Sequence, residues 1–156
     1  MEKFLENIYD AEKILARIGH MVYVTYPLVK DKKLLIQMLL EIKLALAKSI
    51  TSILQYEYYY KRITLSKSPK ENLRTFKTKC ASRYNITFEE IGKIIELFDI
   101  IEKHNKSPFE FKKEEKIVIL SETLNPKVIE FEEIKEFLAL TRVVLEKTKN
   151  IILQRF

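Results

Sequence analysis

Apolar residues recur along the N-terminal part of the chain at alternating spacings of four and three, which is the period of an amphipathic helix. Over residues 2–25 they form one continuous stripe. The stripe comprises Phe4, Ile8, Ala11, Leu15, Ile18 and Val22. Tyr26 precedes Pro27, and the residue before a proline is disfavoured in the α conformation. The pattern therefore predicts a first helix that ends at Tyr26.

The longest uninterrupted helical pattern covers residues 32–62, which contain neither glycine nor proline. Asp31 stands where a helix N-cap residue is wanted. Between Leu34 and Leu46 the apolar residues cover almost the whole circumference, and such a helix needs neighbours on most sides. We therefore expect a helix of about 45 Å, at roughly 1.5 Å per residue, in the centre of a bundle.

Two capping boxes begin the next two helices. Ser68 and Glu71 predict a helix over residues 69–83, and Thr87 with Glu90 predicts another directly after it. The apolar face of the latter comprises Ile91, Ile94, Ile95, Phe98 and Ile101. A last helix is expected from about residue 132. Its inward positions are Ile134, Phe137, Leu138, Thr141, Leu145, Thr148 and Ile152.

The periodicity changes between these last two helices. Ser107 and Glu110 fit a third capping box, which predicts one or two helical turns in the segment PFEFKKEE. The runs KIVILS at 116–121 and KVIEF at 127–131 are rich in β-branched residues, and the residues ETLNP connect them. They predict a small β-hairpin that must pack against the helices, because an isolated hairpin is only marginally stable in water.

The predicted fold is all-α: a helical bundle of about five helices, with a long central helix and a small β-hairpin before the last one, in a single domain over residues 1–156. Cys80 is the only cysteine, so no intramolecular disulfide can form and a reducing cytoplasm is implied. The most apolar run, residues 34–47, is interrupted by polar side chains and is too short to cross a bilayer. We therefore expect a soluble cytoplasmic protein that does not enter a membrane.

Charge is concentrated in one region of the chain. The net charge is +6. The segment from Lys61 to Ile86 contains eight basic residues and a single acidic one, Glu71. On the helix over 69–83, Lys70, Arg74 and Lys77 would share one face that could follow phosphates. The candidate nucleic-acid-binding residues are Lys61, Arg62, Lys67, Lys70, Arg74, Lys77 and Tyr58. An acidic protein is the other partner that this charge favours.

Four tyrosines lie directly before the basic region. On a helix Tyr56, Tyr59 and Tyr60 fall on one side, which continues the apolar row of the central helix. They are predicted to lie in the core or at its rim, with hydroxyls that reach water or a partner. Only Tyr58 points elsewhere and is available to stack on a base.

Catalytic chemistry is sparse. His20 and His104 have no metal-ligating partner three or four residues later, and no glycine-rich phosphate loop or nucleophile motif is present. We therefore predict no catalytic residues, no metal and no cofactor. Gly19 and Gly92 lie alone inside helical patterns, and close approach of another helix would offset their cost.

Two stretches carry a resemblance, YVTYPLVKDKKLLIQMLLEIKLALAKSI (residues 23–50) and KSPFEFKKEEKIVILS (residues 106–121). They resemble a family of small archaeal proteins that has no assigned activity, and the resemblance carries no catalytic residues. A long helical hairpin followed by shorter helices is also similar to HEPN domains, all-helical modules that include RNases. Their RNase motif spaces an arginine and a histidine further apart than Arg17 and His20 are here, so the chain departs from that motif.

These observations favour a cytoplasmic binding or adaptor protein without enzymatic activity. Its partner would be another protein or a second copy of the chain. The alternative is an RNA- or DNA-binding protein that uses the basic region 61–83. A HEPN-like nuclease that uses Arg17 and His20 is the minor alternative.

Overall fold

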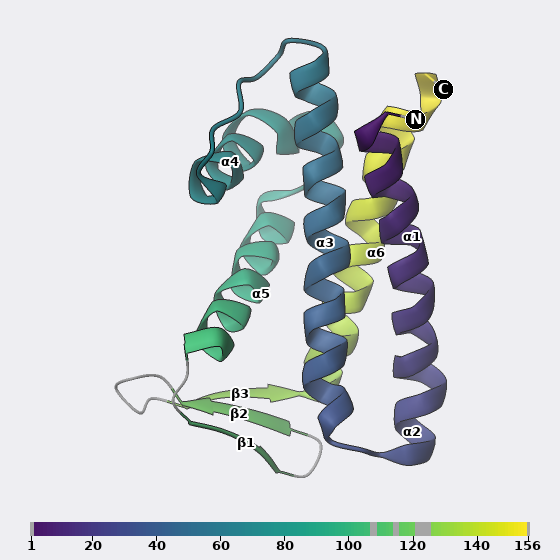
Figure 1. The fold of residues 1–156 in the computed structure, drawn as a ribbon, viewed down its shortest axis with the longest axis vertical. Coiled ribbons are helices and arrows are strands. Elements are labelled where there is room, and N and C mark those ends of the chain that lie inside the picture. The colour runs from purple at the N-terminus through teal and green to yellow at the C-terminus, as the bar shows by residue number, and fades with distance from the viewer. Residues whose placement is uncertain (1, 107–108, 114–115, 121–125, 156) are drawn as a thin grey trace.

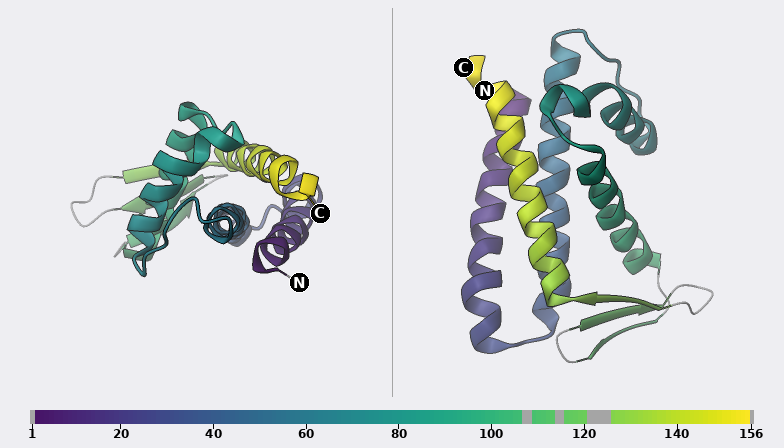
Figure 2. Two further views of the ribbon diagram at one scale, coloured as in Figure 1. Left: turned by 90° about the horizontal axis from the view of Figure 1, so that it is seen from above. Right: turned by 180° about the vertical axis from the view of Figure 1, so that it is seen from behind.

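The computed structural model describes residues 2–106, 109–113, 116–120 and 126–155. Most of this part of the chain is helical, as predicted. Figure 1 shows α1 (Lys3–His20), α3 (Lys33–Tyr59) and α6 (Phe131–Ile152) side by side, with α5 (Phe88–Lys106) on the other side of α3. A small sheet lies across one end of these helices, and both termini lie near the other end (Figure 2).

The N-terminal helix does not end at Tyr26. After α1 the chain passes through a π-helical turn, η1 (Met21–Thr25), into the short α2 (Tyr26–Val29), so the predicted end is wrong. Tyr26 keeps α conformation although a proline follows, because its ring is buried and stacks on Phe131 at 4.5 Å between centroids. Pro27 lies in the first turn of α2, where its missing N–H costs little.

Helix α3 is the central element that the sequence predicts. Asp31 accepts a hydrogen bond from the backbone N–H of Lys33 at 3.0 Å, which satisfies a donor at the start of the helix. Helices α1 and α6 both pack along α3 and bury one side of it. The fully buried α3 side chains include Leu35, Met38, Leu39, Ile42, Leu46 and Ile53. All the inward positions predicted for α6 are buried.

The segment after α3 is helical over the predicted range but changes type. It runs through α4 (Pro69–Thr75), the π turn η2 (Phe76–Cys80) and the 3₁₀ turn η3 (Ala81–Tyr84). Ser68 Oγ accepts from the backbone N–H of Glu71 at 3.4 Å, as the capping box predicts. The buried side chains are Phe76, Cys80, Ala81 and Tyr84, and they fix this segment against the bundle.

The capping box at the start of α5 is complete. The backbone N–H of Glu90 donates to Thr87 Oγ1 at 3.1 Å, and the backbone N–H of Thr87 donates to Glu90 Oε1 at 2.9 Å. The apolar face is only partly as predicted. The buried residues are Ile91, Ile94, Leu97, Ile100 and Ile101, whereas Ile95 and Phe98 are half-buried. Phe98 is therefore available to line a groove.

The sheet has three antiparallel strands in the order β1 (Phe109–Lys113), β2 (Lys116–Leu120), β3 (Pro126–Glu130). Strands β2 and β3 occupy the two β-branched runs, and the sheet differs from a two-stranded hairpin because β1 joins it. The helical turns predicted for PFEFKKEE are therefore wrong over 109–113. The alternation F-E-F has the period of a strand, and pairing along β2 satisfies backbone groups that a free edge would leave open. Ser107 and residues 121–125 lie outside the described residues.

The two isolated glycines have different surroundings. A Cβ atom at Gly19 would lie 2.6 Å from the guanidinium of Arg142 on α6, so the close neighbour is a side chain and not a helix backbone. A Cβ atom at Gly92 would meet no atom from elsewhere in the described chain within 4 Å, so the packing explanation is wrong there. Among the described helices, none combines the length and the apolar character that a membrane span requires.

Candidate functional site

Glu57, in the last turn of α3, is the only charged residue that is buried among the described residues. Its side chain is 2% exposed and binds two arginines. Arg62 Nη1 lies 2.6 Å from Glu57 Oε2, and Arg83 Nε lies 2.9 Å from Glu57 Oε1. This carboxylate therefore ties the loop after α3 and the turn η3 to the end of the central helix.

The sequence pattern did not predict this ion-pair cluster. Glu57 follows Ile50 and Ile53 at spacings of seven and four, so it falls on the buried row of α3. This position in the sequence is the signal that could have predicted a buried carboxylate. A carboxylate on a buried row requires cationic partners. Consequently Arg62 and Arg83, two of the eight cations of the basic region, are engaged with Glu57.

Cys80 and Tyr84, whose pKa values the charge of Glu57 affects, are held in their protonated forms, which are poor nucleophiles. Burial, and then the charge of Glu57, raise the pKa of the Cys80 thiol to about 11. The same two causes raise the pKa of Tyr84, whose hydroxyl is buried. Cys80 therefore stays a thiol at neutral pH, and the thiolate is the reactive form.

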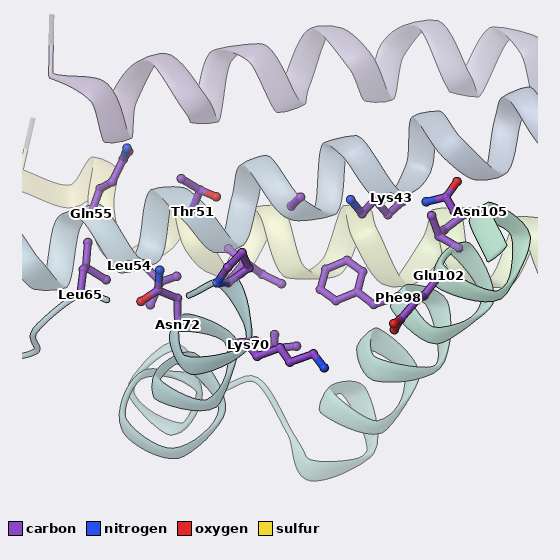
Figure 3. A pocket seen from close by; sticks show the side chains of 15 residues that line it. Lys43, Thr51, Leu54, Gln55, Leu65, Lys70, Asn72, Phe98, Glu102 and Asn105 are labelled. Atoms are coloured by element: carbon purple, nitrogen blue, oxygen red, sulfur yellow. The ribbon is translucent and has the colours of Figure 1, made fainter. Parts of the chain in front are cut away.

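A groove of about 550 Å³ lies between α3, α4 and α5. Figure 3 shows side chains from all three helices turned toward it. Its apolar lining includes Ile50 and Leu54 from α3, Leu73 from α4, and Phe98 and Ile101 from α5. The size and the mostly apolar lining fit the range of ordinary binding sites.

Polar side chains stand at the edges of the groove. Lys43 comes from α3, where its Nζ lies 5.9 Å from the centroid of the Phe98 ring, and Lys70 comes from α4. Asn72 holds the adjoining loop in place, since it accepts from the Ser66 backbone N–H at 2.8 Å and donates to the Ser66 carbonyl at 2.9 Å. The groove is thus a preformed feature with a fixed wall and cations at its rim.

The predicted nucleic-acid-binding residues have different surroundings. Arg62 is turned to Glu57, Lys70 lines the groove, and Lys67 is exposed in the loop before α4. Arg74 lies 3.6 Å from Glu71, and Lys77 is exposed in the π turn η2. The predicted row of Lys70, Arg74 and Lys77 assumed a regular α-helix, and the π turn interrupts that period.

Lys61 and Tyr58 lie together at a second cavity, of about 710 Å³, between the start of α1 and the end of α3. Tyr59 also lines it and is 56% exposed, so its predicted burial is wrong. Figure 1 shows that the end of α3 extends beyond the start of α1, which leaves this last turn partly uncovered. Tyr56 is buried and Tyr60 is half-buried, as predicted, but the buried Tyr56 hydroxyl has no hydrogen-bond partner among the described residues, so the expectation that it reaches water or a partner is wrong.

Arg17 and His20 have separate partners. Arg17 pairs with Glu41 on α3, whereas His20 Nδ1 lies 3.3 Å from Thr25 Oγ1. Within the described parts of the chain, no group of three His, Cys, Asp or Glu residues could hold a metal ion.

No protein-family model matches this chain, and no curated protein or solved structure matches it. The resemblance to a small archaeal family therefore stays a prediction. The two cavities and the charges around them are the features of the described chain that bear on function.

Proposed function

We propose that this protein is a non-enzymatic binding module of the cytoplasm and that the groove between α3, α4 and α5 is its docking site. The occupant is an amphipathic helix of a partner protein, with acidic residues beside its apolar face. The observation that carries this proposal is the groove itself, an apolar channel on the side of the central helix that α1 and α6 do not cover.

The shape of the groove suits a helix. Its α3 wall runs from Lys43 to Gln55 and includes Ala47, Ile50 and Leu54, which lie on one face of α3. At roughly 1.5 Å per residue this wall is about 18 Å long, the length of three helical turns. An amphipathic helix that lays its apolar face in such a groove contacts it through residues at i, i+3, i+4 and i+7.

The charge around the groove favours an acidic partner. Lys43 and Lys70 stand at its rim, and Glu102 is the one acidic residue among the described lining residues. The exposed cations Lys67 and Lys77 lie on the segments that flank α4, one of the helices that line the groove. Complementary charge raises the association rate and excludes partners of the wrong sign.

A binding assay with model peptides tests this proposal. The probe is a fluorescein-labelled amphipathic peptide of fourteen residues with leucines on one face and glutamates beside them, and its partner probe carries lysines in place of the glutamates. We expect the acidic peptide to bind and the basic one to fail, as measured by fluorescence anisotropy. Thr51→Glu, which adds a negative charge at an exposed groove position, should weaken binding about tenfold or more.

Leu44→Glu is the matched control, because Leu44 is exposed on the same helix and does not line the groove. It should leave the affinity for the acidic peptide unchanged. Equal binding of both peptides, or equal loss in the two variants, would contradict docking in the groove. Concentration-dependent self-association that Thr51→Glu abolishes would identify a second copy of the chain as the occupant instead.

A further inference from the structure

The end of α3 presents two adjacent aromatic side chains to solvent. Tyr58 is 55% exposed and Tyr59 is 56% exposed. The ring of Tyr59 is held edge-on by Phe4 at 5.9 Å and by Tyr60 at 5.1 Å between centroids. A held ring with an exposed surface can stack on a flat ligand with little further loss of conformational freedom.

The cavity beside these rings has a mixed polar lining. Lys3 and Lys61 supply cations, Gln55 and Thr64 supply hydrogen-bonding groups, and Glu2 is the acidic residue among the described lining residues. Gln55 Oε1 accepts from Asn7 Nδ2 at 2.8 Å, which fixes the orientation of its amide. Aromatic surface, amide groups and cations together suit a nucleobase with its phosphate.

The backbone conformation of Lys61 is a second observation that supports a role for this cavity. Lys61 adopts the left-handed conformation, with φ of 61°, at the end of α3. Its N–H donates to the Tyr58 carbonyl at 2.9 Å and the N–H of Arg62 donates to the Glu57 carbonyl at 3.0 Å, the pattern of a Schellman motif. Glycine is preferred at this position, yet the chain places there a lysine that lines the cavity.

We propose that this cavity is a binding site for single-stranded nucleic acid, in which Tyr58 and Tyr59 stack on bases and Lys61 and Lys3 contact phosphates. Stacking on aromatic side chains requires bases that are not already paired in a duplex, so a single strand is the substrate class. The guanidinium of Arg62 lies 5.1 Å from the centroid of the Tyr60 ring, and Tyr60 in turn packs against Tyr59. The cavity shares Gln55 with the groove, but Tyr58, Tyr59 and Lys61 line only the cavity, so this proposal does not depend on the function proposed for the groove.

The test is fluorescence anisotropy with fluorescein-labelled oligouridylate and oligothymidylate of twelve nucleotides, at low and at moderate salt. We expect binding that weakens with salt, and a loss of about tenfold in Tyr58→Ala and in Tyr59→Ala, the size of one lost stacking contact. Tyr23→Ala is the matched control, because Tyr23 is 55% exposed and lies in η1, remote from this cavity. It should bind like the wild type.

Lys61→Gly and Lys30→Gly form a second matched pair. Both lysines have positive φ, and only Lys61 lines the cavity. We expect Lys61→Gly to weaken binding and to reduce the salt slope by about one phosphate contact, whereas Lys30→Gly leaves both unchanged. Glycine accepts positive φ without strain, so both variants are expected to keep the fold, and circular dichroism checks this before binding is compared.

Three results would overturn the proposal: no binding at low salt, equal affinity for duplex and single strand, or equal binding by wild type and both tyrosine variants. The last would mean that charge alone holds the polymer. Thr51→Glu should bind oligonucleotides like the wild type, because Thr51 lines only the groove. Failure of the groove proposal and failure of this one are therefore distinguishable.

Discussion

The two sides of α3 differ in how completely they are covered. On one side α1 and α6 pack along the helix, and ion pairs such as Lys149–Glu12, at 2.7 Å between α6 and α1, connect the covering helices. On the other side α4 and α5 leave a groove of about 550 Å³. The same apolar helix thus supplies a closed core and an open surface, and we infer that the first serves stability and the second serves binding.

The largest expected effect is a difference in the free energy of unfolding between a substitution in the core and one in the groove. Leu46 is fully buried on α3, so Leu46→Ala should lower the free energy of unfolding by about 2–5 kcal/mol through lost burial and a residual cavity. Leu65 lines the groove and is exposed, so Leu65→Ala should change it by about 0.5 kcal/mol or less. Urea denaturation measures both. Equal losses would show that the groove side is packed like the core.

The next effect concerns Glu57 at the end of α3. Glu57→Gln leaves Arg62 and Arg83 without their carboxylate, and we expect a loss of about 3 kcal/mol, at the low end for a broken buried pair because both arginines reach water. The pKa of Cys80 should fall below about 11, since burial and the charge of Glu57 both raise it and only the charge is removed. Urea denaturation and thiolate absorbance measure the two effects.

Glu71→Gln is the control for Glu57→Gln, because Glu71 is exposed and lies 3.6 Å from Arg74. It should change stability by about 0.5 kcal/mol or less. If Glu57→Gln were as mild as Glu71→Gln, the cluster at the end of α3 would not hold the following segment in place.

A smaller effect appears in the pH dependence of stability. The folded-state pKa of Cys80 is raised to about 11 from an ordinary value of 9.0, so the folded state retains this proton more strongly. The resulting contribution, at most about 3 kcal/mol, is complete below about pH 9 and is lost as pH rises toward 11. Unfolding of wild type and Cys80→Ala should therefore differ in slope between these values, and parallel curves would contradict a buried thiol.

The smallest effect has the opposite sign. Lys61→Gly relieves the left-handed conformation at the end of α3 and should raise the free energy of unfolding by about 0.5 kcal/mol. Thermal denaturation measures the change, and a loss of stability in Lys61→Gly would show that the lysine side chain makes a stabilising contact.

The parts of the fold that local chemistry determines could be read from the sequence. The capping boxes at Ser68 and Thr87 begin helices, and the inward stripe of α6 is buried throughout. The errors arise where a tertiary neighbour decides. Tyr26 stays helical because Phe131 covers it, and β1 forms because β2 offers an edge.

The candidate sites depended even more on tertiary structure. Helical periodicity located Tyr58 but could not show that Tyr59 stays 56% exposed although its ring packs against Phe4 of α1. The charge count located the basic region but could not show that Glu57 engages Arg62 and Arg83. The groove requires the relative placement of three helices, which no local pattern contains.

The central claim is that the uncovered side of α3 receives a partner helix, and chemical-shift mapping of the isotope-labelled protein tests it most directly. On titration with the acidic amphipathic peptide, we predict that backbone amide shifts change along the groove, at Ala47, Thr51, Leu73 and Phe98, and not along α1. Changes confined to α1 and α6, or no saturable change at millimolar peptide, would contradict the account.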